Sequence, residues 1–379
     1  MHALQDGLTT TVNVLLPILA QAFGLSYAQV GIVKAANVAA MALLEIPSGL
    51  LSERVGARIL LVFGLFIAGV GYVWLSLAAG YAAILFSLSL AGVGAAFQHT
   101  LSSAIISAAF PGTACRPALG TYNASGDVGK LALTGLFTLL IGLGFDWQAI
   151  SRGYGAVSVA LAVLVLVLLY RGGIGGRPWP SATTSGSDVH PASWGIRSKT
   201  AFGGLCAINF LDTMVQSGFL TFVAFLMIEK GVAVSLAALA VVLTLAGGVV
   251  GKFCCGFLAD RMGIIRSLIL VQSLTATGIV AVVIAPPMAA FALLPVLGAF
   301  LQGSTSITYG TIGDLFHPSR QARGFSLIYT TSNIATVTGS IGLGLISDSF
   351  GLNAMMLMMA VLTILPLPLC ALLRTDLAN

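Results

Sequence analysis

Two segments of the chain carry the same pattern, glycine-x-leucine-x-acid-arginine-x-glycine. The first runs from Gly49 to Gly56 and the second from Gly256 to Gly263, so the copies lie 207 residues apart. The same offset, or one residue less, relates Gly24 to Gly231, Pro111 to Pro318, Arg116 to Arg323 and Asp6 to Asp212. A repeat of this period indicates that the chain is an internal duplication.

The composition indicates what is duplicated. Apolar residues make up 58% of the 379 residues, charged residues only 8%, and the mean hydropathy is +1.01. These values are typical of a bilayer protein and exclude a soluble core of this size. Twelve mostly apolar windows are long enough to span a membrane, at 3–23, 28–51, 59–78, 82–110, 117–144, 153–170, 200–228, 233–258, 264–285, 288–315, 322–346 and 352–373.

The sequence therefore predicts an all-α membrane protein with two pseudo-symmetric six-helix bundles. The bundles are expected at 1–170 and 200–379. The stretch 171–199 between them is rich in glycine, proline and serine and is predicted to be a cytoplasmic linker. By the repeat, the counterpart of residue 200 lies about six residues before Met1. We therefore expect the first helix to lack an N-terminal turn.

Basic residues are distributed unevenly between the predicted loops. With the N-terminus inside, twelve of them fall on the cytoplasmic side, and only Arg152 and Lys230 fall in external loops. This asymmetry predicts a multi-pass protein of the cell inner (plasma) membrane with both termini in the cytoplasm. The pI near 9.1 reports this topology and does not indicate a nucleic-acid partner.

No pattern in the chain indicates an enzyme. Walker-type phosphate loops, nucleophile elbows and zinc-ligand spacings are absent from the sequence. The five cysteines lie in or beside predicted helices and suggest no disulfide framework. The first apolar stretch has no basic head, so we expect it to stay in the mature protein. We expect a monomer without cofactor or metal, whose partners are a small-molecule substrate, protons and the lipid bilayer.

The repeated pattern resembles the signature loop of the major facilitator superfamily, which follows the second and the eighth spans. The resemblance covers essentially the whole chain. Glu53 replaces the usual aspartate and Ala57 a basic residue in the first copy, whereas Asp260 in the second copy follows the family pattern. The opening His2-Ala-Leu-Gln-Asp6-Gly and the following Leu-Leu-Pro-Ile-Leu are similar to fosmidomycin-resistance-type drug exporters. The glycine-rich stretch 135–144 lacks the proline that often marks drug and proton antiporters of the superfamily.

The loop pattern has a physical reason of its own. Glycines let two helix ends approach closely, and an acid can pair with an arginine or a helix N-terminus in a contact that breaks when the halves move. The alternative is that these charges only anchor a short turn. Glu45 and Lys252 occupy equivalent positions and could form a salt bridge between the halves. The candidate gating residues are Glu45, Gly49, Glu53, Arg54, Gly56, Arg116, Lys252, Gly256, Asp260, Arg261, Gly263 and Arg323.

Polar residues inside the first span of each half are candidate binding residues, because an ionisable group in hydrocarbon is costly unless it faces a partner or a wet cavity. In 3–23, Asp6 and Asn13 fall on one helix face. In 200–228, Asn209, Asp212 and Gln216 do the same. The resemblance implies that both spans line a central cavity.

The span 117–144 places Asn123, Asp127 and Lys130 on one face. Asp127 and Lys130 are one turn apart and can pair. Either the pair is a locked ion pair that orders the bundle, or it opens so that Asp127 takes a proton or Lys130 holds an anionic group.

Two further equivalent spans supply hydrogen-bonding groups. The span 82–110 contributes Gln98 and His99, and 288–315 contributes Gln302 and Tyr309. His99 could relay protons near neutral pH, or it could be a hydrogen-bonded structural residue.

Together these features predict a secondary active transporter that moves a small organic molecule by alternating access, with proton-coupled efflux. Protonation of Asp6, Asp127 or Asp212 would relieve a charge and let the halves rock. One alternative is a proton-coupled importer of a small organic anion, with Lys130 and Lys252 as substrate ligands. Another is a receptor or assembly partner in the membrane, which would show no substrate-dependent flux.

Overall fold

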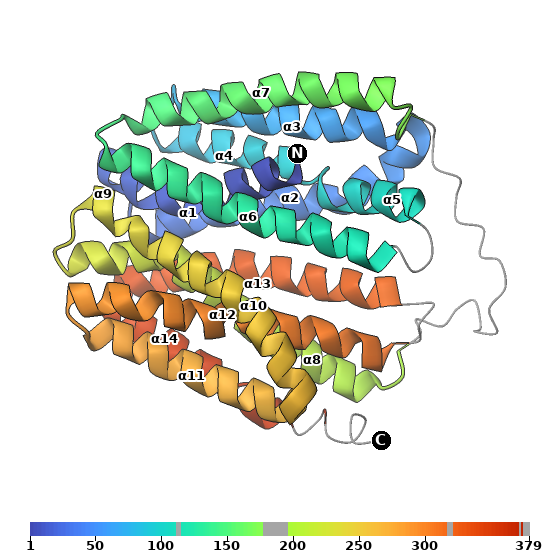
Figure 1. The fold of residues 1–379 in the computed structure, drawn as a ribbon. Helices are drawn as coiled ribbons and strands as arrows, with labels where there is room; N and C mark the ends of the chain where they lie inside the picture. Colours follow the sequence, from blue (N-terminus) through green and yellow to red (C-terminus); the bar gives the residue numbers. More distant parts are fainter. Residues whose placement is uncertain (111–114, 177–195, 317–320, 371–372, 374–379) are drawn as a thin grey trace. The chain divides into compact units, whose positions relative to one another are not determined.

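The computed structural model describes residues 1–110, 115–176, 196–316, 321–370 and 373, and nearly all of them are helical (Figure 1). The chain divides into two compact units, Met1–Thr183 and Thr184–Asn379. The first unit holds α1 (His2–Phe23), α2 (Tyr27–Val55), α3 (Ala57–Leu75), α4 (Tyr81–Ala95), α5 (His99–Ala109), α6 (Cys115–Gly142) and α7 (Trp147–Arg171). The second holds α8 (Lys199–Glu229), α9 (Val234–Ala237), α10 (Leu239–Met262), α11 (Ile264–Ile284), α12 (Pro287–Leu315), α13 (Gln321–Phe350) and α14 (Leu352–Ile364).

The membrane-spanning character of these helices follows from length and composition. Within the described residues, nine helices are long and apolar enough to cross a membrane. The remaining predicted spans correspond to α1, to α4 with α5, and to α13. Helices α1 and α13 are long, but polar side chains lower their hydropathy, as expected of helices that present a polar face to the protein interior. The helices are consistent with the predicted twelve spans.

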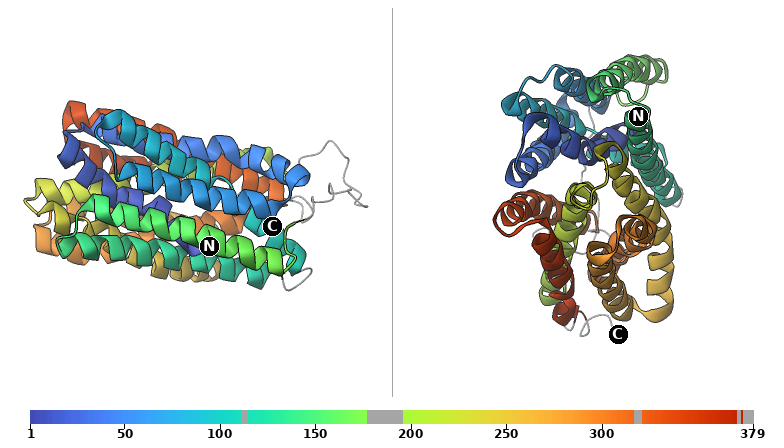
Figure 2. Two further views of the ribbon diagram at one scale, coloured as in Figure 1. Left: turned by 90° about the horizontal axis from the view of Figure 1, so that it is seen from above. Right: turned by 90° about the vertical axis from the view of Figure 1, so that its left-hand side faces the viewer.

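The duplication is visible in how each unit packs. In the first unit α1 lies against α6, α3 against α7, and α4 against both α2 and α3. In the second unit the same pairs recur as α8 with α13, α11 with α14, and α12 with both α10 and α11. Figure 2 views the helices of each unit nearly end-on in its right-hand panel. The repeat read from the sequence is therefore a repeat of helix packing.

The signature loop has the same backbone in both units. Gly56 ends α2 with φ +83°, and Gly263 ends α10 with φ +82°. This left-handed region is accessible to glycine at little cost, so each glycine lets the chain turn directly into the next helix. In the first unit, Arg58 continues the loop and its Nε donates to the carbonyl of Ile174 at 2.7 Å. The loop between α2 and α3 is thereby attached to the end of α7.

Within the predicted span 82–110, a turn at residues 96–98 separates α4 from α5. Gly92 and Gly94 precede the turn and weaken the helix. The helix comes so close to α3 there that a Cβ on Gly94 would lie 2.5 Å from the amide nitrogen of Ala68. Phe97 fills the space beside Gly64. The turn places His99 at the first position of α5.

Candidate functional site

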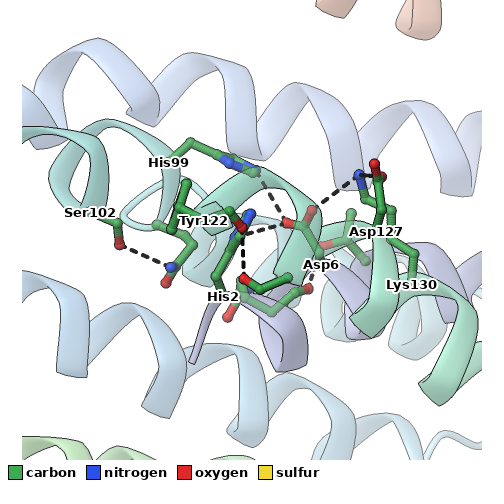
Figure 3. Close-up of polar contacts among 11 residues, drawn as sticks. His2, Asp6, His99, Ser102, Tyr122, Asp127 and Lys130 are labelled. Atoms are coloured by element: carbon green, nitrogen blue, oxygen red, sulfur yellow. Dashed lines mark hydrogen bonds and ion pairs between the residues drawn. The ribbon is translucent and has the colours of Figure 1, made fainter. Parts of the chain in front are cut away.

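Three ionisable side chains converge on the Asp6 carboxylate in the first unit (Figure 3). Lys130 Nζ lies 3.1 Å from Asp6 Oδ2, and His99 Nε2 lies 3.4 Å from Asp6 Oδ1. His2 Nδ1 lies 3.5 Å from the same Oδ1 atom. Lys130 also contacts Asp127 Oδ1 at 3.2 Å. We call His2, Asp6, His99, Asp127 and Lys130 the charged cluster.

The charged cluster depends on close packing of α6 against α1. Gly129 lies directly on the backbone of Ala3, where no side chain fits. A Cβ on Gly126 would lie 2.5 Å from His2 Nε2 and 2.7 Å from Asp6 Oδ2. These two glycines let α6 bring Asp127 and Lys130 alongside Asp6. The close approach of helix backbones through small residues is typical of membrane bundles.

Two members of this site were not predicted from the sequence, His2 and Tyr122. The His2 ring stacks on the Tyr122 ring at a centroid distance of 3.8 Å and meets the His99 ring edge-on at 5.2 Å. His2 stands one helical turn before Asp6, and that spacing is a signal that the sequence did offer. Nothing in the sequence indicates Tyr122, because its role depends on the register of α6 against α1.

The side chains of the charged cluster differ in how much of their surface is exposed. The Asp6 side chain is 7% exposed, Asp127 23%, Lys130 33% and His99 44%. The lysine and His99 therefore remain reachable from outside the packed interior, whereas Asp6 is enclosed. With both histidines neutral, the two carboxylates and one ammonium leave an excess of one negative charge. Such a group of side chains can accept one proton or one cation without building up net positive charge.

The cluster also has atoms of the types that ligate metals. Ligand atoms of His2, Asp6 and His99 all lie within 4.8 Å of one another. The Lys130 ammonium occupies the other oxygen of the same carboxylate at 3.1 Å. A divalent ion between the histidines would face that ammonium at short range, and the two would repel each other. The charge of Asp6 is balanced by the protein's own cation.

A second polar centre surrounds Asp212 in the other unit. Gln216 Nε2 donates to Asp212 Oδ2 at 2.7 Å, and Ser304 Oγ donates to the same oxygen at 2.8 Å. Gln272 Nε2 donates to Oδ1 at 2.8 Å. Gln216 also contacts Thr305 Oγ1 at 3.0 Å. We call Asp212, Gln216, Gln272, Ser304 and Thr305 the neutral-donor centre, and Gln272 and Ser304 were not predicted.

Two predicted residues of the second unit lie near this centre but have other partners. Asn209 Nδ2 donates to Ser332 Oγ at 2.9 Å and ties α8 to α13. The Tyr309 ring packs edge-on against Tyr329, with centroids 5.4 Å apart, and against Phe325. Both residues are therefore held in place by α13.

Other predicted residues are not brought into either centre. Asn13 is buried and its Oδ1 has no partner among the described residues, whereas Asn123 is exposed on α6. Gln98 Nε2 donates to Ser102 Oγ at 3.0 Å. Gln302 is buried where α12 passes α10 at Gly248. The stripes on α1 and α6 thus contribute only some of their polar residues.

The predicted gating residues are only partly described. The structure does not describe the surroundings of four of them, which are Gly49, Glu53, Arg116 and Arg323. Asp260 is exposed, and Arg261 lies over the Phe257 ring at 4.5 Å. The contact predicted between Glu45 and Lys252 joins the two units and stays a prediction.

The sequence matches a known protein family. The family model of the Major Facilitator Superfamily matches residues 1–201 and 205–378. This family consists of membrane transporters, and the repeated all-helical fold agrees with the match. The chain belongs to the Major Facilitator Superfamily.

Individual relatives are distant but cover most of the chain. The chain is 26% identical over 377 residues to an uncharacterized MFS-type transporter, YfnC, of Bacillus subtilis (strain 168), covering 96% of this chain and 88% of the relative. It is 22% identical over 363 residues to the hexuronate transporter of the same organism, covering 90% and 84%.

The fold has close structural neighbours. An inward-facing, unoccupied structure of a bacterial homologue of the human lysosomal transporter Spinster aligns with a TM-score of 0.83 at 17% identity. The alignment covers 100% of this chain and 95% of that one. An inward-facing, occupied structure of such a homologue aligns with a TM-score of 0.81 at 19% identity, covering 99% and 95%. At these identities the likeness concerns the fold alone.

Proposed function

We propose that the protein is a proton-coupled exporter of small organic molecules that works by alternating access in the cell inner membrane. The observation that carries the proposal is the position of Lys130, whose ammonium is shared between Asp6 at 3.1 Å and Asp127 at 3.2 Å. The family supports transport of a small molecule, and the charged cluster supports proton coupling.

The proton acts through the charge of the cluster. One ammonium balances one of the two carboxylates, so a proton that enters neutralises the excess charge. Protonation of Asp127 would leave Lys130 to Asp6 alone, and protonation of Asp6 would leave it to Asp127. In a medium of low dielectric constant such a change in pairing alters the energy of the cluster strongly. The proton thus shifts the balance between two arrangements of the bundle.

Export follows if substrate and proton compete for the excess charge. A substrate with a cationic or polar group occupies the exposed side of the cluster, and proton entry from the opposite side displaces it. The substrate-binding candidates beyond the cluster are Asn13, Gln98, Asn123, Asn209, Gln216, Gln302 and Tyr309. The gating role is proposed for the residues that the sequence predicted for it, and the positive-inside asymmetry supports a cytoplasmic position of both termini.

The test is a flux measurement in liposomes that contain a trapped pH dye. A panel of hydrophobic drugs and small organic anions is added under an imposed proton gradient. We expect drug-dependent proton flux in the unmodified protein and its loss in Asp6→Asn and Asp127→Asn. The matched control is Asp146→Asn, because Asp146 is exposed at the start of α7 and its side chain makes no capping hydrogen bond. Unchanged coupled flux in both cluster variants would contradict the proposal.

A second candidate function is proton-coupled import of a small organic anion. Lys130 is a third exposed and can hold a carboxylate once Asp127 is protonated. The likeness to a relative named a hexuronate transporter supports an organic anion as the substrate. Flux with sugar acids in the same direction as protons, lost in Lys130→Gln, would favour import. No flux with any compound would favour a receptor or assembly role.

A further inference from the structure

Two buried tyrosines connect α3 and α7 to the helices that carry the charged cluster. The hydroxyl of Tyr72 on α3 donates to the carbonyl of Leu8 on α1 at 2.5 Å. The hydroxyl of Tyr154 on α7 donates to the carbonyl of Leu133 on α6 at 2.7 Å. The two tyrosines are 0% and 7% exposed. A carbonyl oxygen has two lone pairs, so it can accept a tyrosine hydroxyl in addition to its helical hydrogen bond.

The two hydrogen bonds lie next to the charged cluster. Leu8 follows Asp6 by two residues, and Leu133 follows Lys130 by three. A Cβ on Gly7 would clash with the Leu133 side chain, so α1 and α6 touch at this same level. Each tyrosine therefore holds one of the two helices within one helical turn of the residue that this helix contributes to the ion pair.

The tyrosines are supported by a close contact between α3 and α7, which lie side by side (Figure 1). A Cβ on Gly155 would lie 2.5 Å from the carbonyl oxygen of Gly69, so no side chain separates the two backbones there. Tyr72 lies three residues after Gly69. Tyr154 directly precedes Gly155, and its ring centroid is 6.5 Å from that of Tyr72. Packing of this density leaves the two rings little freedom and fixes the directions of their hydroxyl groups.

We propose that Tyr72 and Tyr154 are positioning residues of the charged cluster. From the pair of α3 and α7 they hold α1 against α6, and thereby set the contact of 3.1 Å between Asp6 Oδ2 and Lys130 Nζ. The inference deepens the proposed function and rests on it for its role in transport. It assigns to two uncharged side chains the control of how readily the charged cluster takes up a proton. Each hydroxyl acts through the helix whose carbonyl it binds.

Proton uptake depends on the distance between Asp6 and Lys130 because the ammonium stabilises the ionised carboxylate. The Coulomb energy of an ion pair changes most steeply with distance where water is excluded, and the Asp6 side chain is only 7% exposed. A small increase in the distance therefore weakens the stabilisation of the carboxylate relative to the carboxylic acid. The cluster then binds its proton at a higher pH.

The other groups around Asp6 act in the same direction. The titratable side chains of the surroundings are His2 on α1, with the N-terminal ammonium of Met1 beside it, His99 on α5, and Tyr122, Asp127 and Lys130 on α6. Within the described residues, the ion pairs of Asp6 come from these three helices and none comes from α2, α3, α4 or α7. His2 moves with Asp6, because both are on α1. Movement of α1 thus alters the contacts with His99 and Lys130, and a cation at either position favours the ionised carboxylate.

The experiment titrates the carboxyl groups of the purified full-length protein in detergent by infrared difference spectroscopy. The carbonyl bands that disappear in Asp6→Asn and Asp127→Asn identify the protonated carboxyl groups of the charged cluster. In Tyr72→Phe and Tyr154→Phe we expect the midpoint of these bands to move to higher pH by about 0.5–1 unit, a part of the 1–3 units that a neighbouring opposite charge contributes. The double variant is expected to move further.

A matched control separates positioning from a general loss of stability. Asn37 Nδ2 donates to the carbonyl of Leu88 at 2.7 Å and ties α2 to α4 in the same unit. Asn37→Leu thus removes one buried hydrogen bond between helices, as each tyrosine variant does. We expect all three single variants to lower the unfolding temperature in detergent, and only the two tyrosine variants to move the midpoint of the carboxyl bands.

Two results would overturn the proposal. One is an unchanged midpoint in both Tyr72→Phe and Tyr154→Phe, and the other is an equal shift in Asn37→Leu. The proposed function is tested separately, by the proton flux of the unmodified protein in liposomes. A shifted midpoint in the tyrosine variants without proton flux in the unmodified protein would support the positioning role and contradict proton-coupled export.

Discussion

The first helix of each unit carries an aspartate at nearly the same place in the repeat, yet the two carboxylates are stabilised in different ways. Asp6 on α1 is surrounded by ionisable partners from α5 and α6. Asp212 on α8 is surrounded by neutral donors from α11 and α12. Duplication thus preserved the helix packing while the partners diverged.

The largest expected effect comes from removing the cation of the charged cluster. Lys130→Gln leaves Asp6 and Asp127 close together without their shared ammonium. We expect a loss of about 3 kcal/mol in stability, at the low end of the range for breaking a buried ion pair because Lys130 is partly exposed. Thermal unfolding in detergent measures the change.

The control for this variant is a second substitution that restores the net charge of the charged cluster. Lys130→Gln/Asp127→Asn has the same excess of one negative charge as the unmodified cluster, so we expect it to be more stable than Lys130→Gln alone. Equal stability of the two variants would show that packing, and not charge, accounts for the loss. No such rescue is expected at Asp212, where there is no lysine among the described partners to remove.

The next effect concerns the packing that assembles the charged cluster. Gly126→Ala places a methyl group 2.5 Å from His2 Nε2 and 2.7 Å from Asp6 Oδ2, so α6 must shift or the cluster must open. We expect a loss of about 1–3 kcal/mol, as for overpacking of a core, and a strong reduction of proton flux in liposomes. Gly142→Ala on the same helix is the matched control, because nothing lies within 4 Å of its added Cβ.

In the neutral-donor centre a single donor can be deleted. Gln272→Leu removes the hydrogen bond to Asp212 Oδ1, which is 2.8 Å long. The buried oxygen then lacks its partner, and we expect a stability loss of about 1–3 kcal/mol, measured by thermal unfolding in detergent. A loss below that of Gly142→Ala would contradict the view that this hydrogen bond holds the carboxylate.

The smallest effect is expected at the C-terminal ends of α1 and α8. Lys230, after α8, donates to the carbonyls of Val283 and Ala285 at 2.6 and 2.7 Å and so holds the end of α11. The equivalent Phe23 on α1 instead meets Trp147 edge-on, with ring centroids 6.2 Å apart. We expect Lys230→Met to cost about 1 kcal/mol in thermal unfolding. An unchanged unfolding temperature would show that these hydrogen bonds are replaced by water.

Part of the site could be predicted from local spacing. Asp127 and Lys130 are one helical turn apart, and the structure places their charged atoms 3.2 Å apart. Asp6 stood out because a charged residue in an apolar span requires a partner. Its particular partners could not be predicted, because Lys130 is 124 positions further along the chain and only the contact of α6 with α1 brings the two together.

The position of His99 illustrates the same limit. The window 82–110 is apolar enough to be predicted as one span, and nothing local to it indicates that His99 contacts Asp6 on α1. The turn at residues 96–98 follows Gly94, where α4 packs closely against α3, and such a contact between helices has no local sequence signature. Gln272 was missed for a related reason, since only the tertiary structure brings this residue of α11 to Asp212 on α8.

The sequence by itself determined the duplication, the membrane class, the helices and the family, because hydropathy and an eight-residue repeated pattern depend only on the order of residues. Only the tertiary structure decided that Asp6 shares a lysine with Asp127 while Asp212 has neutral donors. That difference arises from helix register and from glycine contacts between segments far apart in the chain. The physical reason is that the state of a buried charge depends on atoms within a few ångströms of it, and these come from other helices.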